Sequence, residues 1–148
     1  RIITGRVYAY LKARNIGKED FVLIKLPRGV QPIIAMIGIW RAGAALVIVE
    51  DTLAPERIDY IYKDCNCKIA ITSEEWEEIN LCEPLEGYEE TDPHDAAYAV
   101  YTSGTTGNPK GVLHEYGNYI IGRMGIPYRE KGVNIIKTAD GVVKKIVR

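Results

Sequence analysis

Residues 96–111 read AAYAVYTSGTTGNPKG, an apolar run that passes directly into glycines and hydroxyl side chains. The apolar part, Ala97–Tyr101, contains no turn-forming residue, which predicts a short buried strand. In the polar part, glycines let backbone N–H groups approach an anion, hydroxyl groups add hydrogen bonds, and a lysine adds positive charge. This combination predicts a polyphosphate-binding loop. Its candidate binding residues are Thr102, Ser103, Gly104, Thr105, Thr106, Gly107 and Lys110.

The spacing differs from that of the Walker A loop of kinases and GTPases. In that motif Lys follows the second Gly directly, whereas Asn108 and Pro109 stand between Gly107 and Lys110 here. A kinase or GTPase is therefore disfavoured. Taken on composition alone, the loop could also be a polar surface turn rich in Gly and Thr.

The string YTSGTTGNPKG, residues 101–111, resembles at nearly every position the AMP-binding signature of the adenylate-forming enzymes. This superfamily includes acyl-CoA synthetases, luciferases and the adenylation domains of nonribosomal peptide synthetases. Two upstream stretches look most like the peptide synthetase domains. They are WRAGAALVIVE, residues 40–50, and APERIDYIYKDCNCKIAIT, residues 54–72.

The resemblance implies that the loop holds the β- and γ-phosphates of ATP while an amino acid or related carboxylic acid attacks the α-phosphate. An acyl adenylate and pyrophosphate result, and Lys110, the catalytic candidate, compensates the charge of the leaving pyrophosphate. The complete enzyme would also use Mg²⁺ and a carrier protein bearing phosphopantetheine. The chain contains no YGPTE-like block for magnesium, no TGD-like block for the ribose and no carboxy-terminal domain with its catalytic lysine. We therefore expect an N-terminal-subdomain fragment that is inactive alone.

The sequence departs from the family pattern at a few positions. Ile48 stands where the family usually has Pro, and Glu50 stands where it has Asp. Glu115 and Asn118 match familiar positions, but Tyr116 replaces the His commonly found between them. Any contact that this His would make is not expected here.

Helical and strand patterns alternate along the chain. Helices are predicted from Ile3 to Gly17, from Gln31 to Gly43, from Pro55 to Cys65 and, capped by Ser73, from Glu74 to Asn80. Strands are predicted at Phe21–Leu26, Ala44–Val49, Lys68–Thr72 and Ala97–Tyr101. The helix at 31–43 has almost no polar face and should be covered on most sides.

This order predicts an α/β fold. The expected sheet is flavodoxin-like, doubly wound and mostly parallel, with helices on both faces and the loop at the carboxyl end of a strand. Val133–Thr138 and Val142–Val147 flank Ala139–Gly141 as a C-terminal β-hairpin would. We divide the chain into an α/β subdomain at 1–118 and a tail at 119–148.

Composition indicates which partners the protein is not expected to bind and in which compartment it is expected. The 148 residues carry 19 basic and 20 acidic side chains, and a net charge of -1 gives no case for nucleic acid or an anionic membrane. No apolar run is long enough to span a bilayer, and no signal-peptide core opens the sequence, so a cytoplasmic protein is expected. The sequence has three cysteines, Cys65, Cys67 and Cys82. Because an odd number does not fit a framework of disulfide pairs, we expect free thiols. No metal site is expected from them or from His94 and His114, which should be surface or capping residues.

Two other functions fit the same sequence. The chain could be a flavodoxin-like nucleotide- or phosphate-binding module without catalysis. It could also be a scaffold subdomain that pairs in trans with the remainder of an enzyme, through the exposed apolar surface of its early helices.

Overall fold

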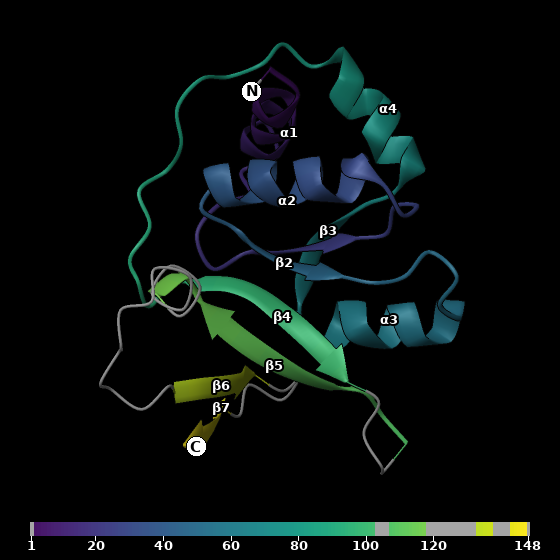
Figure 1. The fold of residues 1–148 in the computed structure, drawn as a ribbon, viewed down its shortest axis with the longest axis vertical. Helices are drawn as coiled ribbons and strands as arrows, with labels where there is room; N and C mark the ends of the chain where they lie inside the picture. The colour runs from purple at the N-terminus through teal and green to yellow at the C-terminus, as the bar shows by residue number, and fades with distance from the viewer. Residues whose placement is uncertain (1, 103–106, 118–132, 138–142, 148) are drawn as a thin grey trace.

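The computed structural model describes residues 2–102, 107–117, 133–137 and 143–147. Within these ranges, helices lie against a single mixed sheet with strand order β3-β1-β2-β4-β5-β6-β7 (Figure 1). The helices are α1 (Ile2–Lys12), α2 (Val30–Arg41), α3 (Pro55–Asp64) and α4 (Ser73–Leu81). The strands are β1 (Phe21–Ile24), β2 (Ala45–Ile48), β3 (Cys67–Ile71), β4 (Ala96–Thr102), β5 (Lys110–Glu115), β6 (Val133–Lys137) and β7 (Val143–Val147).

The first four strands form the parallel half of the sheet. β1 pairs with β2 on one side and with β3 on the other, and β2 pairs with β4, all in parallel. The predicted α/β class with a mostly parallel sheet is confirmed. β5, which the sequence did not predict, runs antiparallel to β4.

The predicted C-terminal hairpin is also confirmed. β6 and β7 pair antiparallel from Val133↔Val147 to Lys137↔Val143, and their connection at 138–142 lies outside the described residues. β6 pairs in turn with β5 through Leu113↔Ile135. The hairpin therefore continues the same sheet beyond β5.

Helices cover both faces of the parallel half, as predicted. Helices α1, α2 and α4 lie on one face and α3 on the other (Figure 1). Alternate residues of β1 point to opposite faces, so Val22 and Ile24 pack with the first three helices, while Phe21 and Leu23 pack with α3. All four side chains are buried. The apolar run FVLI is thus explained by burial on both faces rather than by one inward stripe.

Helix α2 differs from the prediction in one respect. Its inner face, with Ala35 and Ile39 fully buried, belongs to the core. Its outer face leaves Val30, Ile33 and Ile37 exposed by 65%, 53% and 41%. The sheet and α1 cover the rest of the helix, so it is covered on most sides except for this stripe, over which no element among the described residues lies.

Helices α1 and α2 approach each other closely at Gly38. A methyl group placed on Gly38 would lie 2.3 Å from Cβ of Val7 and 2.5 Å from its Cγ1. Val7 is fully buried. The absence of a side chain at Gly38 therefore sets the spacing of these two helices.

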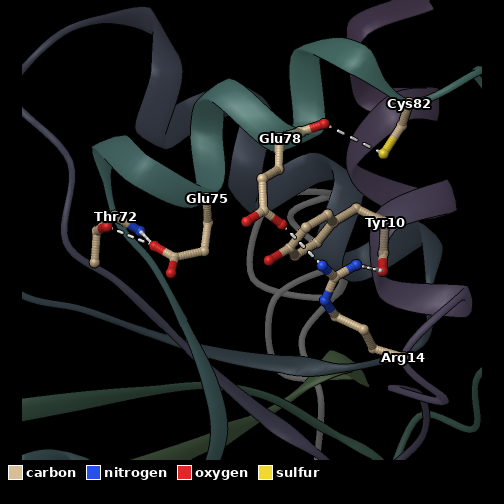
Figure 2. A network of polar contacts seen from close by, with 6 residues as sticks. All are labelled: Tyr10, Arg14, Thr72, Glu75, Glu78 and Cys82. Atoms are coloured by element: carbon tan, nitrogen blue, oxygen red, sulfur yellow. Dashed lines mark hydrogen bonds and ion pairs between the residues drawn. The ribbon is translucent and has the colours of Figure 1, made fainter.

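Helix α4 is fixed at its start by a capping box. The side chain of Thr72 accepts a hydrogen bond from the Glu74 amide at 3.2 Å. The Glu75 carboxylate accepts one from the Thr72 amide at 2.9 Å, as Figure 2 shows. The predicted cap at Ser73 is wrong by one residue, because Thr72 is the residue with extended backbone, at φ −108° and ψ −173°. Trp76 and Ile79 of this helix point inward and are buried.

The same helix is tied to α1 by an arginine. The Arg14 guanidinium lies over the Tyr10 ring, 3.5 Å from its centroid, and donates to Glu78 at 2.9 Å (Figure 2). These contacts join the end of the first helix to the solvent side of the last one.

Residues 82–95 form the connection from α4 to β4. Tyr8 donates its hydroxyl hydrogen to Glu89 at 2.7 Å, and Lys12 pairs with the same carboxylate at 2.7 Å. Arg41 donates to the carbonyl oxygens of Leu85 and Gly87 at 2.9 Å and 2.8 Å. The connection is therefore held along α1 and α2 by polar side chains.

Two further expectations concern cysteines and membrane spans. Cys65, Cys67 and Cys82 are free thiols. A hydrogen bond with Cys65 and burial raise the pKa of Cys67, so this thiol stays protonated. None of the helices in the described part of the chain combines the length and the hydropathy needed to cross a bilayer.

Candidate functional site

The candidate loop connects two antiparallel strands. β4 and β5 pair along their length, with Tyr101 opposite Gly111 and Thr102 opposite Lys110. We predicted from the sequence that this loop follows a strand, β4, but we did not predict β5, the strand after the loop. The loop is therefore the turn of a hairpin, and its first and last residues are cross-strand neighbours.

The structure places three of the candidate binding residues. Thr102 is exposed at the end of β4, and Lys110 is exposed at the start of β5. Gly107 is exposed with φ +96°, and a side chain there would have no neighbour within 4 Å among the residues that the structure describes. Such a backbone conformation favours glycine. Ser103, Gly104, Thr105 and Thr106 lie outside the described residues.

Lys110 is available to an incoming anion. It forms no ion pair with any carboxylate that the structure describes. Thr102 and Lys110 face each other across the ladder, so a hydroxyl group and an ammonium group bracket the two ends of the loop. This arrangement suits an oxyanion ligand.

The loop leaves the sheet at the same edge as the carboxyl ends of β1 and β2, because β4 runs parallel to both. A hollow of about 340 Å³ lies at this edge, between the ends of β1 and β2 and the start of α2. Two of its lining residues, Arg28 and Glu50, form a surface ion pair at 2.6 Å. Ligands of open parallel sheets bind at this edge.

Tyr101 connects the base of the loop to helix α3. Its hydroxyl donates to Oδ2 of Asp64, the last residue of α3, at 2.7 Å. A methyl group on Gly111 would lie 2.7 Å from Cζ of the Tyr101 ring, so the ring covers the Gly111 backbone. Burial, with Cys65 and Asp64 close by, raises the pKa of Tyr101, and the hydroxyl remains a donor. Sequence reasoning missed this contact, since nothing local links Tyr101 to Asp64.

A second hollow of about 380 Å³ lies on the α2 side of β4. Its walls are apolar and aromatic, and they include Met36, Trp40, Ile48, Tyr98 and Val100. Both Ile48 and Val100 are nearly half exposed. The hollow is thus open to solvent beside the strand that carries the loop.

The two histidines have different surroundings. His94 is exposed, as expected, with Nδ1 3.3 Å from a carboxylate oxygen of Glu115. His114 is not a simple surface residue, because its ring stacks on Tyr98 with centroids 4.5 Å apart. Burial lowers the pKa of His114. The part of the chain that the structure describes holds no group of three His, Cys, Asp or Glu residues suited to a metal ion.

Tyr116, the departure from the family pattern, belongs to the scaffold. Its hydroxyl donates to the carbonyl oxygen of Ala44 at 3.0 Å, and its ring meets Trp40 edge-on at 6.5 Å. Burial raises the pKa of Tyr116. The residue holds the end of β5 to β2 and does not face the loop ends.

The comparison with known sequences agrees with the motif. The sequence model of the family described as AMP-binding enzyme matches residues 4–140. Surfactin synthase subunit 1 of Bacillus subtilis (strain 168) is 35% identical over 126 residues, which cover 76% of this chain and 4% of that protein. The nonribosomal peptide synthetase apmB of Penicillium brevicompactum is 29% identical over 129 residues, covering 76% of this chain and 6% of that protein.

Solved structures share the fold. The N-terminal subdomain of Klebsiella oxytoca NpsA, in complex with 3-hydroxyanthranilyl-AMSN, superposes with a TM-score of 0.71 at 26% identity, covering 84% of this chain and 34% of that chain. The anthranilate CoA ligase AuaEII, in complex with anthranoyl-AMP, gives a TM-score of 0.71 at 20% identity, covering 82% and 29%. This chain thus spans about a third of these two structures and a few per cent of the two synthetases. The chain belongs to the AMP-binding enzyme family.

Proposed function

We propose that this chain is the phosphate-binding part of an adenylate-forming ligase. The enzyme activates an amino acid or a related carboxylic acid with ATP. The observation that carries the proposal is the YTSGTTGNPKG loop, held between β4 and β5 with Lys110 opposite Thr102, in a chain of the AMP-binding family. Two of the structures with this fold are complexes with 3-hydroxyanthranilyl-AMSN and with anthranoyl-AMP.

The proposed step is nucleophilic substitution at phosphorus. A carboxylate oxygen of the acid attacks the α-phosphorus of ATP, the bond to the bridging oxygen breaks, and pyrophosphate leaves with the electron pair. Negative charge therefore grows on the leaving group at the loop. Donors that are already oriented toward that charge lower the barrier, and removing one such donor typically costs about 10²- to 10³-fold in rate.

The loop residues are assigned by what they can donate. We assign phosphate hydrogen bonds to the four hydroxyl side chains and close backbone approach to Gly104 and Gly107, and we assign charge compensation to Lys110. The hydroxyl side chains are those of Thr102, Ser103, Thr105 and Thr106.

Other groups of the complete enzyme would come from outside this chain. We propose Mg²⁺ as the partner of ATP, a carrier protein with phosphopantetheine as the acceptor, and a cytoplasmic location. The described residues offer no three-ligand cluster for a metal, so no step is assigned to the ion here. We propose residues 1–118 as the α/β subdomain and 119–148 as a tail, whose β6-β7 hairpin extends the sheet through its pairing with β5.

The decisive experiment is acid-dependent exchange of labelled pyrophosphate into ATP, measured on the complete parent protein and on residues 1–148. We expect exchange by the complete protein and none by the short chain, because positioning supplies a large share of such catalysis. Robust exchange by the short chain would contradict the fragment interpretation. Absence of exchange with every acid tested on the complete protein would remove the proposed function.

Lys110 provides the residue-level test. In the complete protein, Lys110→Ala should slow exchange about 100-fold with an unchanged denaturant midpoint, because an exposed lysine contributes little to the core. Lys110→Arg should restore only part of the rate, since a planar guanidinium does not replace a compact ammonium. Lys68→Ala, at an exposed position of β3, is the matched control and should leave the rate unchanged.

One observation favours a second candidate function. The exposed Val30, Ile33 and Ile37 on α2 would suit a scaffold subdomain that pairs in trans with the rest of an enzyme. Exchange that appears only when the short chain and the remainder of the protein are mixed would support it. If the mixture shows no exchange while the intact protein is active, the result would argue against this second function.

A further inference from the structure

The base of the loop is held by one aromatic side chain. The Tyr101 ring covers Gly111 across the hairpin, and a methyl group on Gly111 would lie 2.7 Å from Cζ and 3.0 Å from the hydroxyl oxygen. An aromatic ring over a cross-strand glycine pins the register of an antiparallel pair. Gly111 is the residue next to Lys110, so the contact acts directly beside the charged group.

The register decides where Lys110 projects. Side chains alternate between the faces of a strand, so a slip of one residue would turn Lys110 to the opposite face of the sheet. It would also place a side chain of β5 where the Tyr101 ring now lies. The fit of the ring against Gly111 therefore opposes such a slip.

The ring is itself fixed by a rigid element. Its hydroxyl donates to Asp64 at 2.7 Å, and α3 is anchored in the core through Ile61, which is 3% exposed. An acidic residue at the last position of a helix is unfavourable, because the helix dipole is negative there. The neighbouring Lys63 does not offset the charge of Asp64, since it pairs with Asp59 at 2.7 Å. The position of Asp64 in the helix gives no reason for an acidic residue there. Its hydrogen bond with Tyr101 supplies one.

We propose that Tyr101 is a positioning residue for Lys110, acting through its hydrogen bond to Asp64 and its contact with Gly111. The inference rests on the proposed function, because it assigns Lys110 to the charge on leaving pyrophosphate. Tyr101 touches neither ATP nor the acid in this scheme. It fixes the strand ends from which the loop residues reach the phosphates.

The test uses pyrophosphate exchange by the complete parent protein carrying Tyr101→Phe, Lys110→Ala or both. Tyr101→Phe keeps the ring and removes the donor, and we expect kcat to fall about tenfold while KM for ATP changes less than about twofold. In the Lys110→Ala background, the same change should have almost no further effect, because the group that it positions is gone.

A matched control separates positioning from stability. Tyr8 also donates to a carboxylate at 2.7 Å, that of Glu89, but it lies on α1, away from the loop. Tyr8→Phe should lower the denaturant midpoint about as much as Tyr101→Phe and leave kcat unchanged. Gly111→Ala, which displaces the ring, should reproduce the kcat loss of Tyr101→Phe.

Three results would overturn this inference and leave the proposed function intact. They are an unchanged kcat in Tyr101→Phe, an equal loss in Tyr8→Phe, and the same fold-loss from Tyr101→Phe with and without the Lys110 side chain. In each case the wild type would still exchange pyrophosphate and Lys110→Ala would still slow it. A wild-type protein without exchange would instead overturn the proposed function, and this inference with it.

Discussion

Replacing Gly38 by alanine tests how tightly the helical layer is packed. The new methyl group would lie 2.3 Å from Cβ of Val7, well inside van der Waals contact. Cβ is fixed to the backbone of α1, so no change of rotamer at Val7 can move it away. The two helices must separate, which loosens the packing of the fully buried Val7, Leu11 and Ile39.

Two opposing effects set the size of the loss. Alanine is favoured over glycine inside a helix by about 1 kcal/mol. Overpacking a well-filled core costs about 1–3 kcal/mol, and a clash between Cβ atoms of two helices belongs at the upper end. The expected result is a net loss of about 2 kcal/mol in the free energy of unfolding.

Urea unfolding followed by circular dichroism measures this loss. With a typical slope of about 2 kcal/mol/M, the midpoint should fall by about 1 M. Gly17→Ala is the control, because a methyl group there would lie 3.8 Å from its nearest neighbour, the carbonyl oxygen of Ala42. Truncation of Val7 to alanine should leave most of the cost of Gly38→Ala, because alanine keeps the Cβ atom that the new methyl group meets. A midpoint for Gly38→Ala at or above that of the wild type would refute the argument that this glycine sets the helix spacing.

Three further predictions concern a helix cap and two titrating groups. Thr72→Ala should cost about 1 kcal/mol in unfolding free energy, whereas Ser73→Ala should cost little, which urea midpoints will distinguish. Burial lowers the pKa of His114, so the unfolded chain binds this proton more readily and stability should fall as the pH drops below about 6.5. His114→Gln should flatten that part of a midpoint-versus-pH curve, and an unchanged slope would count against it. Hydrogen bonds from Lys12 and then Tyr8 lower the pKa of Glu89, so its contribution is present above the ordinary glutamate pKa of about 4.3 and disappears as the pH falls through the lower native value. In Glu89→Gln this loss of stability at low pH should be absent. An equal loss in the wild type and the variant would contradict the prediction.

The parallel half of the sheet was predictable because its signals are local. FVLI and ALVI are continuous apolar runs between turn residues, and Pro55 marks the start of α3. The site was located by a string of adjacent residues, YTSGTTGNPKG, whose chemistry can be read without knowing the fold. The roles of its individual residues remain predictions.

The features that were missed depend on residues distant in sequence. β5, KGVLHE, has charged residues at both ends and few apolar ones, and it is a strand because β4 pairs with it. Asp64 and Tyr101 carry no mutual signal until the fold brings them within 2.7 Å. The cap at Thr72 rather than Ser73 was decided by backbone angles, since either hydroxyl could serve.

The strand order also has a consequence for the folding pathway. β1 and β2 are joined through α2 alone, whereas β4 pairs with β2 only after α3, β3, α4 and a long connection. Contacts between distant segments form late, because closing a longer loop costs more entropy. We therefore expect β4 to dock onto an existing β3-β1-β2 sheet, so that the loop's hairpin is assembled last. Kinetic measurements on Ala99→Gly would show this as faster unfolding with a nearly unchanged folding rate, and slower folding would place β4 in the nucleus instead.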